Sequence, residues 1–98
     1  TEAGRILNPL SLDGQIHGGI AMGVGYCLME EIDYIDGIPV QDSLSTYLIP
    51  TSLDIPNMVC ETVNGFENSG PQGLKGAAEV SSVSIAPAIV DAVNQVKN

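Results

Sequence analysis

Residues 14–30 carry a helical apolar pattern that four glycines interrupt. Apolar side chains recur at every fourth position, the spacing of one helix face, at Ile16, Ile20, Val24 and Leu28. The glycines stand at positions 18, 19, 23 and 25, and each costs about 1 kcal/mol relative to alanine inside a helix. Because isolated helices are only marginally stable in water, close neighbours on two faces must compensate. We therefore predict a buried helix over about residues 14–30, at the centre of something larger than these residues.

Two features concern how this helix begins and what surrounds it. Pro9 disfavours helical angles at Asn8, and Ser11 or Asp13 offers an N-cap. Gly19 and Gly23 also match a lipid-facing GxxxG pair. The apolar run over residues 18–29 is too short to cross a bilayer, so the pattern favours a protein interior.

The remainder of the chain predicts a small sheet and a second helix. Residues 31–35 alternate like a strand, and Asp36-Gly37 is a strong turn signal, so we expect a hairpin over about residues 31–41. Residues 57–63 are apolar on both faces, which predicts a central strand at about 57–64. A helical pattern covers about residues 83–96, with Pro87 in its first turn. The predicted fold class is α+β, with a small mixed sheet.

The composition limits the kinds of partner that the chain can bind. The 98 residues carry a net charge of −9, which argues against nucleic acid or an anionic membrane as a partner. Cys27 and Cys60 stand alone, without CxxC spacing or a nearby histidine, so we expect reduced thiols, no zinc site and a cytoplasmic protein. No signal peptide opens the chain, and both ends look cut, as in a fragment.

The loop over residues 70–79 is the strongest candidate for chemistry. Three glycines, a proline and two alanines surround Lys75 and Glu79, so another group can approach the main chain closely. The pattern puts Glu79 just before a helix N-terminus, where the helix dipole favours a carboxylate. An ordinary loop with a dipole-compensating glutamate is the alternative.

Two polar residues begin the glycine-rich helix. The Gln15 amide can both donate to and accept from a polar ligand, although a simple helix-start residue would look the same. His17 is interpreted as a hydrogen-bonded or solvent-facing side chain rather than a catalytic one.

Three stretches, taken in order, resemble the C-terminal part of the molybdenum-binding subunit of the xanthine dehydrogenase and aldehyde oxidase family. The resemblance covers nearly the whole chain, and the order and spacing of the motifs carry it. The motifs are GRILNP at 4–9 with GQ at 14–15 and the glycines that follow, STYLIPT at 45–51 with DIP at 54–56, and GPQGLKGAAE at 70–79 with APAI at 86–89.

The resemblance implies a molybdenum hydroxylase that adds water-derived oxygen to an electron-poor carbon of a purine, another N-heterocycle or an aldehyde. It implies that Glu79 is the general base and that Gln15 contacts a molybdenum pyranopterin, possibly in dinucleotide form. Lys75 and Gly76 would support the same loop. The pterin sulfurs would hold the metal, which explains the lack of a His/Cys cluster. Iron–sulfur (2Fe-2S) and FAD groups are expected in partner domains or subunits, and the chain alone is expected to bind no cofactor.

One position departs from the family pattern. The loop most often has glycine before the glutamate, whereas Ala78 stands there in this chain, and alanine tolerates positive φ poorly. Either the backbone is already in an ordinary region or the loop is displaced. The second hypothesis is a non-catalytic acidic interaction domain that retains the scaffold. As a fragment, the chain is expected to be inactive and to self-associate, since its glycine-rich helix would expose apolar area.

Overall fold

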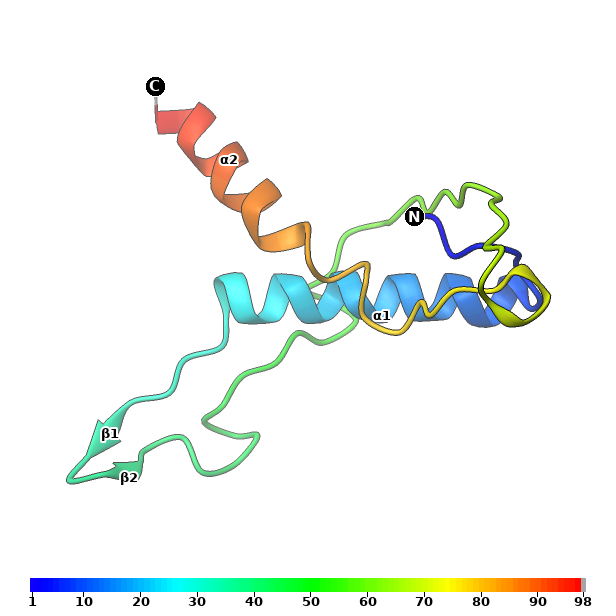
Figure 1. The fold of residues 1–98 in the computed structure, drawn as a ribbon. Coiled ribbons are helices and arrows are strands. Elements are labelled where there is room, and N and C mark those ends of the chain that lie inside the picture. Colours follow the sequence, from blue (N-terminus) through cyan, green and yellow to red (C-terminus); the bar gives the residue numbers. More distant parts are fainter. Residues whose placement is uncertain (98) are drawn as a thin grey trace.

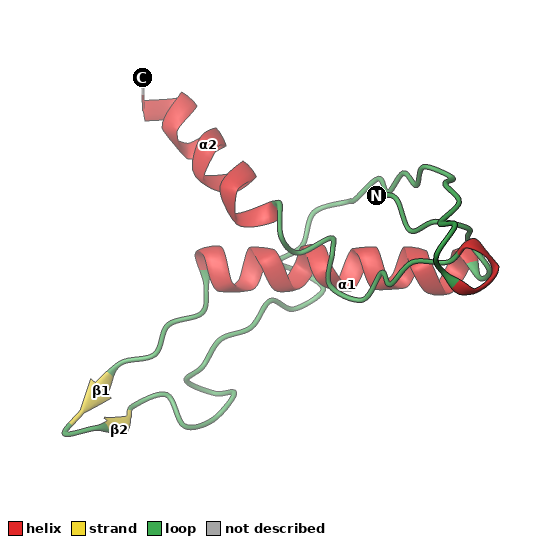
Figure 2. Ribbon diagram, viewed as in Figure 1, coloured by secondary structure: helices red, strands yellow, loops and turns green. Residues whose placement is uncertain are grey.

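The computed structural model describes residues 1–97 and has an α+β architecture (Figures 1 and 2). A long helix lies at its centre, a short hairpin projects from one end, and a second helix leaves the first obliquely. In chain order the elements are α1 (Pro9–Leu28), β1 (Tyr34–Ile35), β2 (Ile38–Pro39), the 3-10 turn η1 (Pro71–Gly73) and α2 (Ile85–Lys97). No helix among these residues is both long and apolar enough to cross a membrane.

Helix α1 begins earlier than its apolar pattern predicts. Asn8 is the N-cap, and its side-chain oxygen accepts a hydrogen bond of 3.0 Å from the backbone N–H of Ser11. Pro9 occupies the first helical position, where its missing N–H costs nothing and its fixed φ suits the helix. The predicted caps, Ser11 and Asp13, therefore lie inside the helix, and the predicted start at residue 14 is wrong by more than one turn.

The glycines of α1 allow other segments to touch the helix backbone. A Cβ on Gly19 would collide with the Ser81 side chain, and one on Gly23 would lie 2.6 Å from the Cβ of Ile85. On another face, a Cβ on Gly25 would lie 2.7 Å from the Cδ of Pro50. Close neighbours on two helix faces, as the glycine pattern predicts, are confirmed at these three glycines, whereas Gly18 has no neighbour within 4 Å in the described chain.

The hairpin follows its turn chemistry. Strands β1 and β2 pair antiparallel, with Tyr34 opposite Pro39 and Ile35 opposite Ile38. Asp36 (φ 50°) and Gly37 (φ 80°) both adopt positive φ, as the two central residues of a type I′ turn do. The hairpin lies at the far end of the molecule from the loop over residues 70–79 (Figure 1).

The predicted central strand at 57–64 is not present. These residues run without regular structure, and only Val63 forms an isolated parallel bridge, to Glu2. Val59, which a central strand would bury, is 90% exposed. A strand needs a paired neighbour for its backbone groups, and in the described residues such pairing is limited to Thr1 and Glu2, which meet this segment only at Glu61 and Val63. The sheet in residues 1–97 is therefore the antiparallel hairpin alone and not a mixed sheet.

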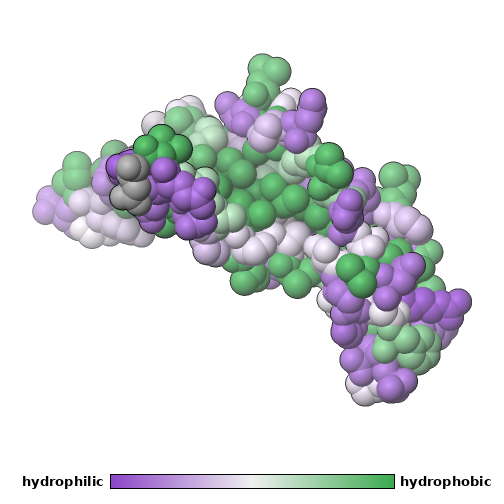
Figure 3. All heavy atoms as spheres, turned by 90° about the horizontal axis from the view of Figure 1, so that it is seen from above, coloured by the Kyte–Doolittle hydropathy of each residue, from purple (hydrophilic) through white to green (hydrophobic). Residues whose placement is uncertain are grey.

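The chain has almost no core of its own. Among the described residues, the buried apolar side chains are Ala3 and Ile16. The radius of gyration is 17.0 Å, compared with about 13 Å for a compact domain of this length. A hydrophobic patch runs across the middle of one face (Figure 3). Helix α1, predicted to be buried, is covered in this chain only at Ile16 and at three of its glycines.

The isolated 98-residue chain is therefore expected to self-associate, because contiguous apolar patches of this kind are rare on soluble monomers. Light scattering coupled to size-exclusion chromatography at increasing protein concentration measures this. Replacing the highly exposed Leu53 (94% exposed) and Val59 by aspartate should reduce the apparent mass. A concentration-independent monomer for the unsubstituted chain would contradict the expectation.

Candidate functional site

The first half of the loop is anchored to the N-terminal segment. The carbonyl of Gly73 accepts a hydrogen bond of 2.8 Å from the Arg5 N–H, and the Lys75 N–H donates to the carbonyl of Ala3 at 3.1 Å. Gly73 has a φ of 82°, and a Cβ there would overlap the Phe66 ring. Gly73 is thus required for packing within the chain and does not open the loop to a ligand.

The second half of the loop is open. Lys75, Gly76, Ala78 and Glu79 are exposed, and a Cβ added to Gly76 would meet no atom within 4 Å. In residues 1–97, positive φ outside glycine occurs only at Asp36 and Gln72. Ala78 therefore has an ordinary backbone conformation, and alanine in place of glycine introduces no strain there.

Gln15 reaches this loop from α1. Its Nε2 donates a hydrogen bond to the carbonyl of Ala78, across 63 positions of sequence. One of its amide hydrogens is used in this way, which leaves its carbonyl oxygen and its second N–H available. The structure thus brings Gln15 directly beside the residue that precedes Glu79.

Glu79 is exposed, and its backbone is held in a turn. Its carbonyl accepts two hydrogen bonds from Ser82, one from the N–H at 3.0 Å and one from Oγ at 2.8 Å. Helix α2 begins only at Ile85 and has no acidic residue in its first turn. The predicted position of Glu79 at the helix N-terminus is wrong, because turn residues 80–84 intervene and the dipole effect fades within one turn.

Lys75 is engaged with the N-terminal segment. Its Nζ lies 2.5 Å from the Glu2 Oε2, and Glu2 Oε1 accepts a 2.6 Å hydrogen bond from the Gly4 N–H. The hydrogen bond from Lys75, and then that from Gly4, lowers the pKa of the Glu2 carboxyl. The same contact raises the pKa of Lys75. Lys75 thus ties the loop to the start of the chain, with its charge directed toward Glu2.

This ion pair predicts a pH dependence. Because the pKa of Glu2 is lowered on folding, its contribution to stability is present above the ordinary glutamate pKa and is lost as the pH falls through the lowered value. Glu2→Gln should therefore lower the thermal midpoint at neutral pH, and the difference from wild type should shrink below about pH 4. The effect is small because the pair is solvent-accessible. Glu31→Gln, at an exposed position, is the control, and a pH-independent difference would contradict the assignment.

The fold also gathers three potential metal ligands that lie far apart in the sequence. Ligand atoms of Asp13, His17 and Cys60 lie within 4.8 Å of one another, a grouping that sequence spacing did not reveal. Asp13 Oδ2 lies 3.4 Å from His17 Nδ1. A carboxylate beside a histidine ring nitrogen commonly orients a metal-binding histidine and is not itself a ligand. That leaves two ligands, fewer than zinc sites use, and we assign no metal to the group.

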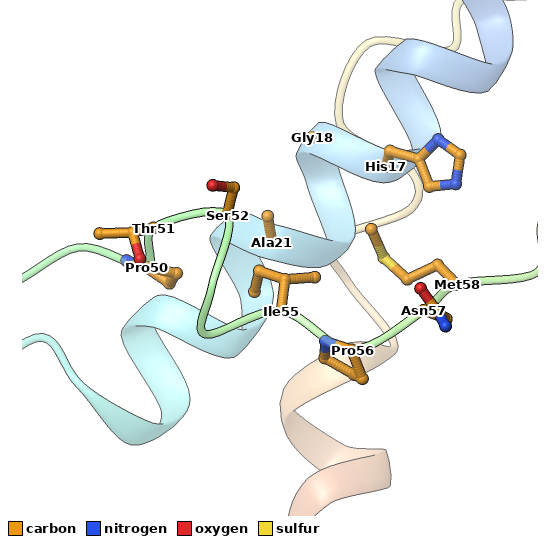
Figure 4. A pocket seen from close by; sticks show the side chains of 10 residues that line it. All are labelled: His17, Gly18, Ala21, Pro50, Thr51, Ser52, Ile55, Pro56, Asn57 and Met58. Atoms are coloured by element: carbon orange, nitrogen blue, oxygen red, sulfur yellow. The ribbon is translucent and has the colours of Figure 1, made fainter.

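One hollow of the described chain lies outside the loop that carries Glu79. It has a volume of about 480 Å³ and lies between His17, Gly18 and Ala21 of α1 and residues 50–58 of the crossing segment (Figure 4). None of its lining residues comes from the loop over 70–79. By helical spacing, His17 and Ala21 lie on a different face of α1 from Gln15 and Gly19, so this hollow is not continuous with the contact between Gln15 and the loop.

Two residues near the loop do not stand out in the sequence. Tyr26 Oη donates to the carbonyl of Ser82 at 2.8 Å, and Ser82 in turn holds Glu79. The spacing Gln15, Gly19, Gly23, Tyr26 follows one helix face, and that periodicity was the available signal for Tyr26. Ser82 is one of three serines between Glu79 and α2, and its position in the sequence does not distinguish it from the other two.

Comparisons with known proteins identify the family of the chain. The profile of the molybdopterin cofactor-binding domain matches residues 1–56. The chain is 39% identical over 94% of its length to a probable xanthine dehydrogenase subunit of Bacillus subtilis, and 38% identical over 96% to the gamma subunit of the 6-hydroxypseudooxynicotine dehydrogenase complex of Paenarthrobacter nicotinovorans. The crystal structure of quinoline 2-oxidoreductase from Pseudomonas putida 86 superimposes with a TM-score of 0.87, at 40% identity over 95% of this chain.

The chain belongs to the molybdopterin cofactor-binding domain family. The resemblance to molybdenum-binding subunits of xanthine dehydrogenase-type oxidoreductases is confirmed. The chain spans 12% of the length of these curated relatives and 12% of the quinoline 2-oxidoreductase chain. Its elongated shape and exposed apolar faces are therefore those of a segment that recurs inside much larger chains.

Proposed function

We propose that this chain forms part of the catalytic subunit of a molybdenum hydroxylase, with Glu79 as the general base and Gln15 at the cofactor. The contact between Gln15 and the Ala78 carbonyl carries the proposal, because it brings together the two residues to which the family resemblance gives roles. Both residues are exposed, and Glu79 directly follows the residue that Gln15 contacts. A base must be able to reach a reacting group, and no side chain within residues 1–97 hydrogen bonds the Glu79 carboxylate.

The residues present fit a large pterin cofactor. The free amide atoms of Gln15 offer a donor and an acceptor, and the open main chain at Gly76 admits a bulky group. Gln15 and the Gly76 backbone would hold the molybdenum pyranopterin, with Lys75 stabilising the loop through Glu2. When bound, that group supplies the transferred oxygen and takes up the electron pair that leaves the substrate. The metal would be held by the pterin sulfurs and by no side chain of this chain.

The chain's own chemical contribution is proton transfer. Glu79 accepts a proton at its carboxylate as oxygen is added to the substrate carbon, which must be electron-poor to accept a nucleophile. Purines, other N-heterocycles and aldehydes meet that requirement, and the relatives include a probable xanthine dehydrogenase and a quinoline 2-oxidoreductase. We further propose that iron–sulfur and flavin domains or subunits receive the electrons, that the protein is cytoplasmic, and that the 98-residue chain alone is inactive.

The test is made with a complete subunit that carries this chain, expressed with its partner subunits. Molybdenum and pterin contents are measured first, followed by oxidation of a purine, a quinoline and an aromatic aldehyde with an artificial electron acceptor. We expect near-stoichiometric molybdenum and turnover of at least one class. A folded subunit that binds no pterin under conditions that load a known relative would overturn the proposal. A non-catalytic interaction domain is not favoured, because the curated relatives are named as oxidoreductase subunits, and Ala78 imposes no strain.

A further inference from the structure

We infer that Ser82 and Tyr26 are positioning residues for Glu79, an inference that rests on the proposed role of Glu79 as base. Together they tie the backbone that carries this carboxylate to helix α1. Neither residue belongs to the motif that suggested the site, and neither side chain contacts the Glu79 carboxylate. Ser82 and Tyr26 fix the Glu79 backbone and thereby the direction in which the Glu79 side chain points.

Ser82 closes the turn that contains Glu79. Its N–H and its Oγ both donate to the Glu79 carbonyl, at 3.0 and 2.8 Å. A serine hydroxyl that bonds a carbonyl three residues earlier competes with regular structure and stabilises a turn. Because the carbonyl of Glu79 is held by two donors, rotation about its Cα–C bond is restricted. Ser82 is only 7% exposed, so water competes poorly for these bonds.

Tyr26 connects this turn to α1. Its hydroxyl donates to the Ser82 carbonyl at 2.8 Å, while Gln15, on the same helix face, donates to the Ala78 carbonyl. The backbone is therefore attached to one rigid helix on both sides of Glu79, at residues 78 and 82. The carboxylate itself stays free to react.

Ser81 provides a built-in comparison. It is as buried as Ser82, at 7% exposure, but its Oγ has no hydrogen-bond partner within the described chain. Its side chain packs where Gly19 has no Cβ. Removing the Ser81 hydroxyl therefore removes a buried polar atom without a partner, whereas removing the Ser82 hydroxyl removes a bond to the backbone of Glu79.

The experiment compares Ser82→Ala, Ser82→Thr, Ser81→Ala and Tyr26→Phe in the complete, cofactor-loaded subunit. Displacement of a catalytic group by about 1 Å can cost about 10²-fold in rate. We expect Ser82→Ala to lower kcat by about 10- to 100-fold and Tyr26→Phe by about 5-fold, with KM and molybdenum content unchanged. Ser82→Thr keeps the hydroxyl and should restore most of the kcat, and Ser81→Ala should match wild type.

Two further measurements separate positioning from general destabilisation. Hydrogen exchange of a peptide covering residues 79–84, followed by mass spectrometry, should be faster in Tyr26→Phe and Ser82→Ala but not in Ser81→Ala. In the Glu79→Gln background, Ser82→Ala should cause no further loss, because residues that act through one group are not additive. A wild-type kcat in Ser82→Ala would overturn the inference. So would a fall in kcat that is equal in Ser82→Ala and Ser81→Ala and that accompanies a lower thermal midpoint in both. If Ser82→Ala does not fold, wild-type kcat in Tyr26→Phe overturns it.

The failure of the proposed function would look different. If Glu79→Gln retains wild-type turnover, the assignment of the base is wrong irrespective of the serines. If Glu79→Gln lowers turnover by about 10²- to 10⁴-fold and Ser82→Ala causes a further loss in that background, Glu79 is the base but Ser82 acts on another group, and the positioning inference alone is overturned.

Discussion

Glu79→Gln is expected to lower turnover by about 10²- to 10⁴-fold, the usual contribution of a general base. Glutamine has the same shape as glutamate but cannot take up the proton. Because Glu79 is exposed and its carboxylate has no partner within residues 1–97, the substitution should leave the fold intact. Molybdenum and pterin contents should stay at the wild-type level, since Gln15 and the Gly76 backbone are proposed to hold the cofactor. Steady-state kinetics and metal analysis on one preparation measure both quantities.

Glu67→Gln is the matched control, because it removes the same charge from a nearby loop. The Glu67 carboxylate accepts hydrogen bonds from the N–H (3.0 Å) and Oγ (2.7 Å) of Ser69, and the bond from the Ser69 hydroxyl is the main cause of its lowered pKa. Removing the Glu67 charge should affect the local turn and should leave turnover unchanged. Near-normal turnover in a fully loaded Glu79→Gln subunit would remove Glu79 from the mechanism.

Gly19→Ala is expected to be the most destabilising single-methyl addition in α1. The new Cβ would collide with the Ser81 side chain and lie 3.3 Å from the Ser82 N. Overpacking of this kind typically costs about 1–3 kcal/mol, and here the backbone that must shift is the one that holds Glu79. The thermal midpoint should fall, and kcat should fall with it, because the turn at 79–82 is displaced from α1.

The adjacent Gly18 is the control for this prediction. A Cβ at Gly18 meets nothing within 4 Å in the described chain, and alanine is favoured over glycine in a helix by about 1 kcal/mol. Gly18→Ala should therefore leave kcat unchanged and not lower the midpoint. Equal behaviour of the two variants in differential scanning fluorimetry and kinetics would show that the packing of Ser81 and Ser82 on Gly19 is unimportant.

The sequence was most informative where structure depends on neighbouring residues. The Asp36-Gly37 turn adopts the positive φ values that its residue types favour, and both helices form where the apolar period predicts them, with shifted starts. Asn8 is extended, as Pro9 predicts. The predicted start of α1 is wrong because the predicted cap is Ser11 or Asp13, whereas Asn8 is the cap and Pro9 occupies the first helical position, where a proline costs nothing. The strand predicted at 57–64 does not form for a different reason. Apolar residues indicate that a segment is buried, but they do not supply the partner strand that pairing requires, and residues 1–97 contain none for this segment.

The candidate site divides in the same way. Residue types predicted a loop over residues 70–79, whose main chain is accessible only in its second half. The order of the motifs indicated Gln15, Lys75, Gly76 and Glu79 as the functional candidates. Only the tertiary structure decided that Gln15 meets Ala78, that Lys75 turns to Glu2, and that Tyr26 and Ser82 hold the Glu79 backbone. The first set follows from local conformational preferences. The contacts of Gln15, Lys75 and Tyr26 join positions 56 to 73 residues apart. Which side chains meet over such separations is set by how residues 81–85 pack on Gly19 and Gly23 and by how the loop bonds to the N-terminal segment.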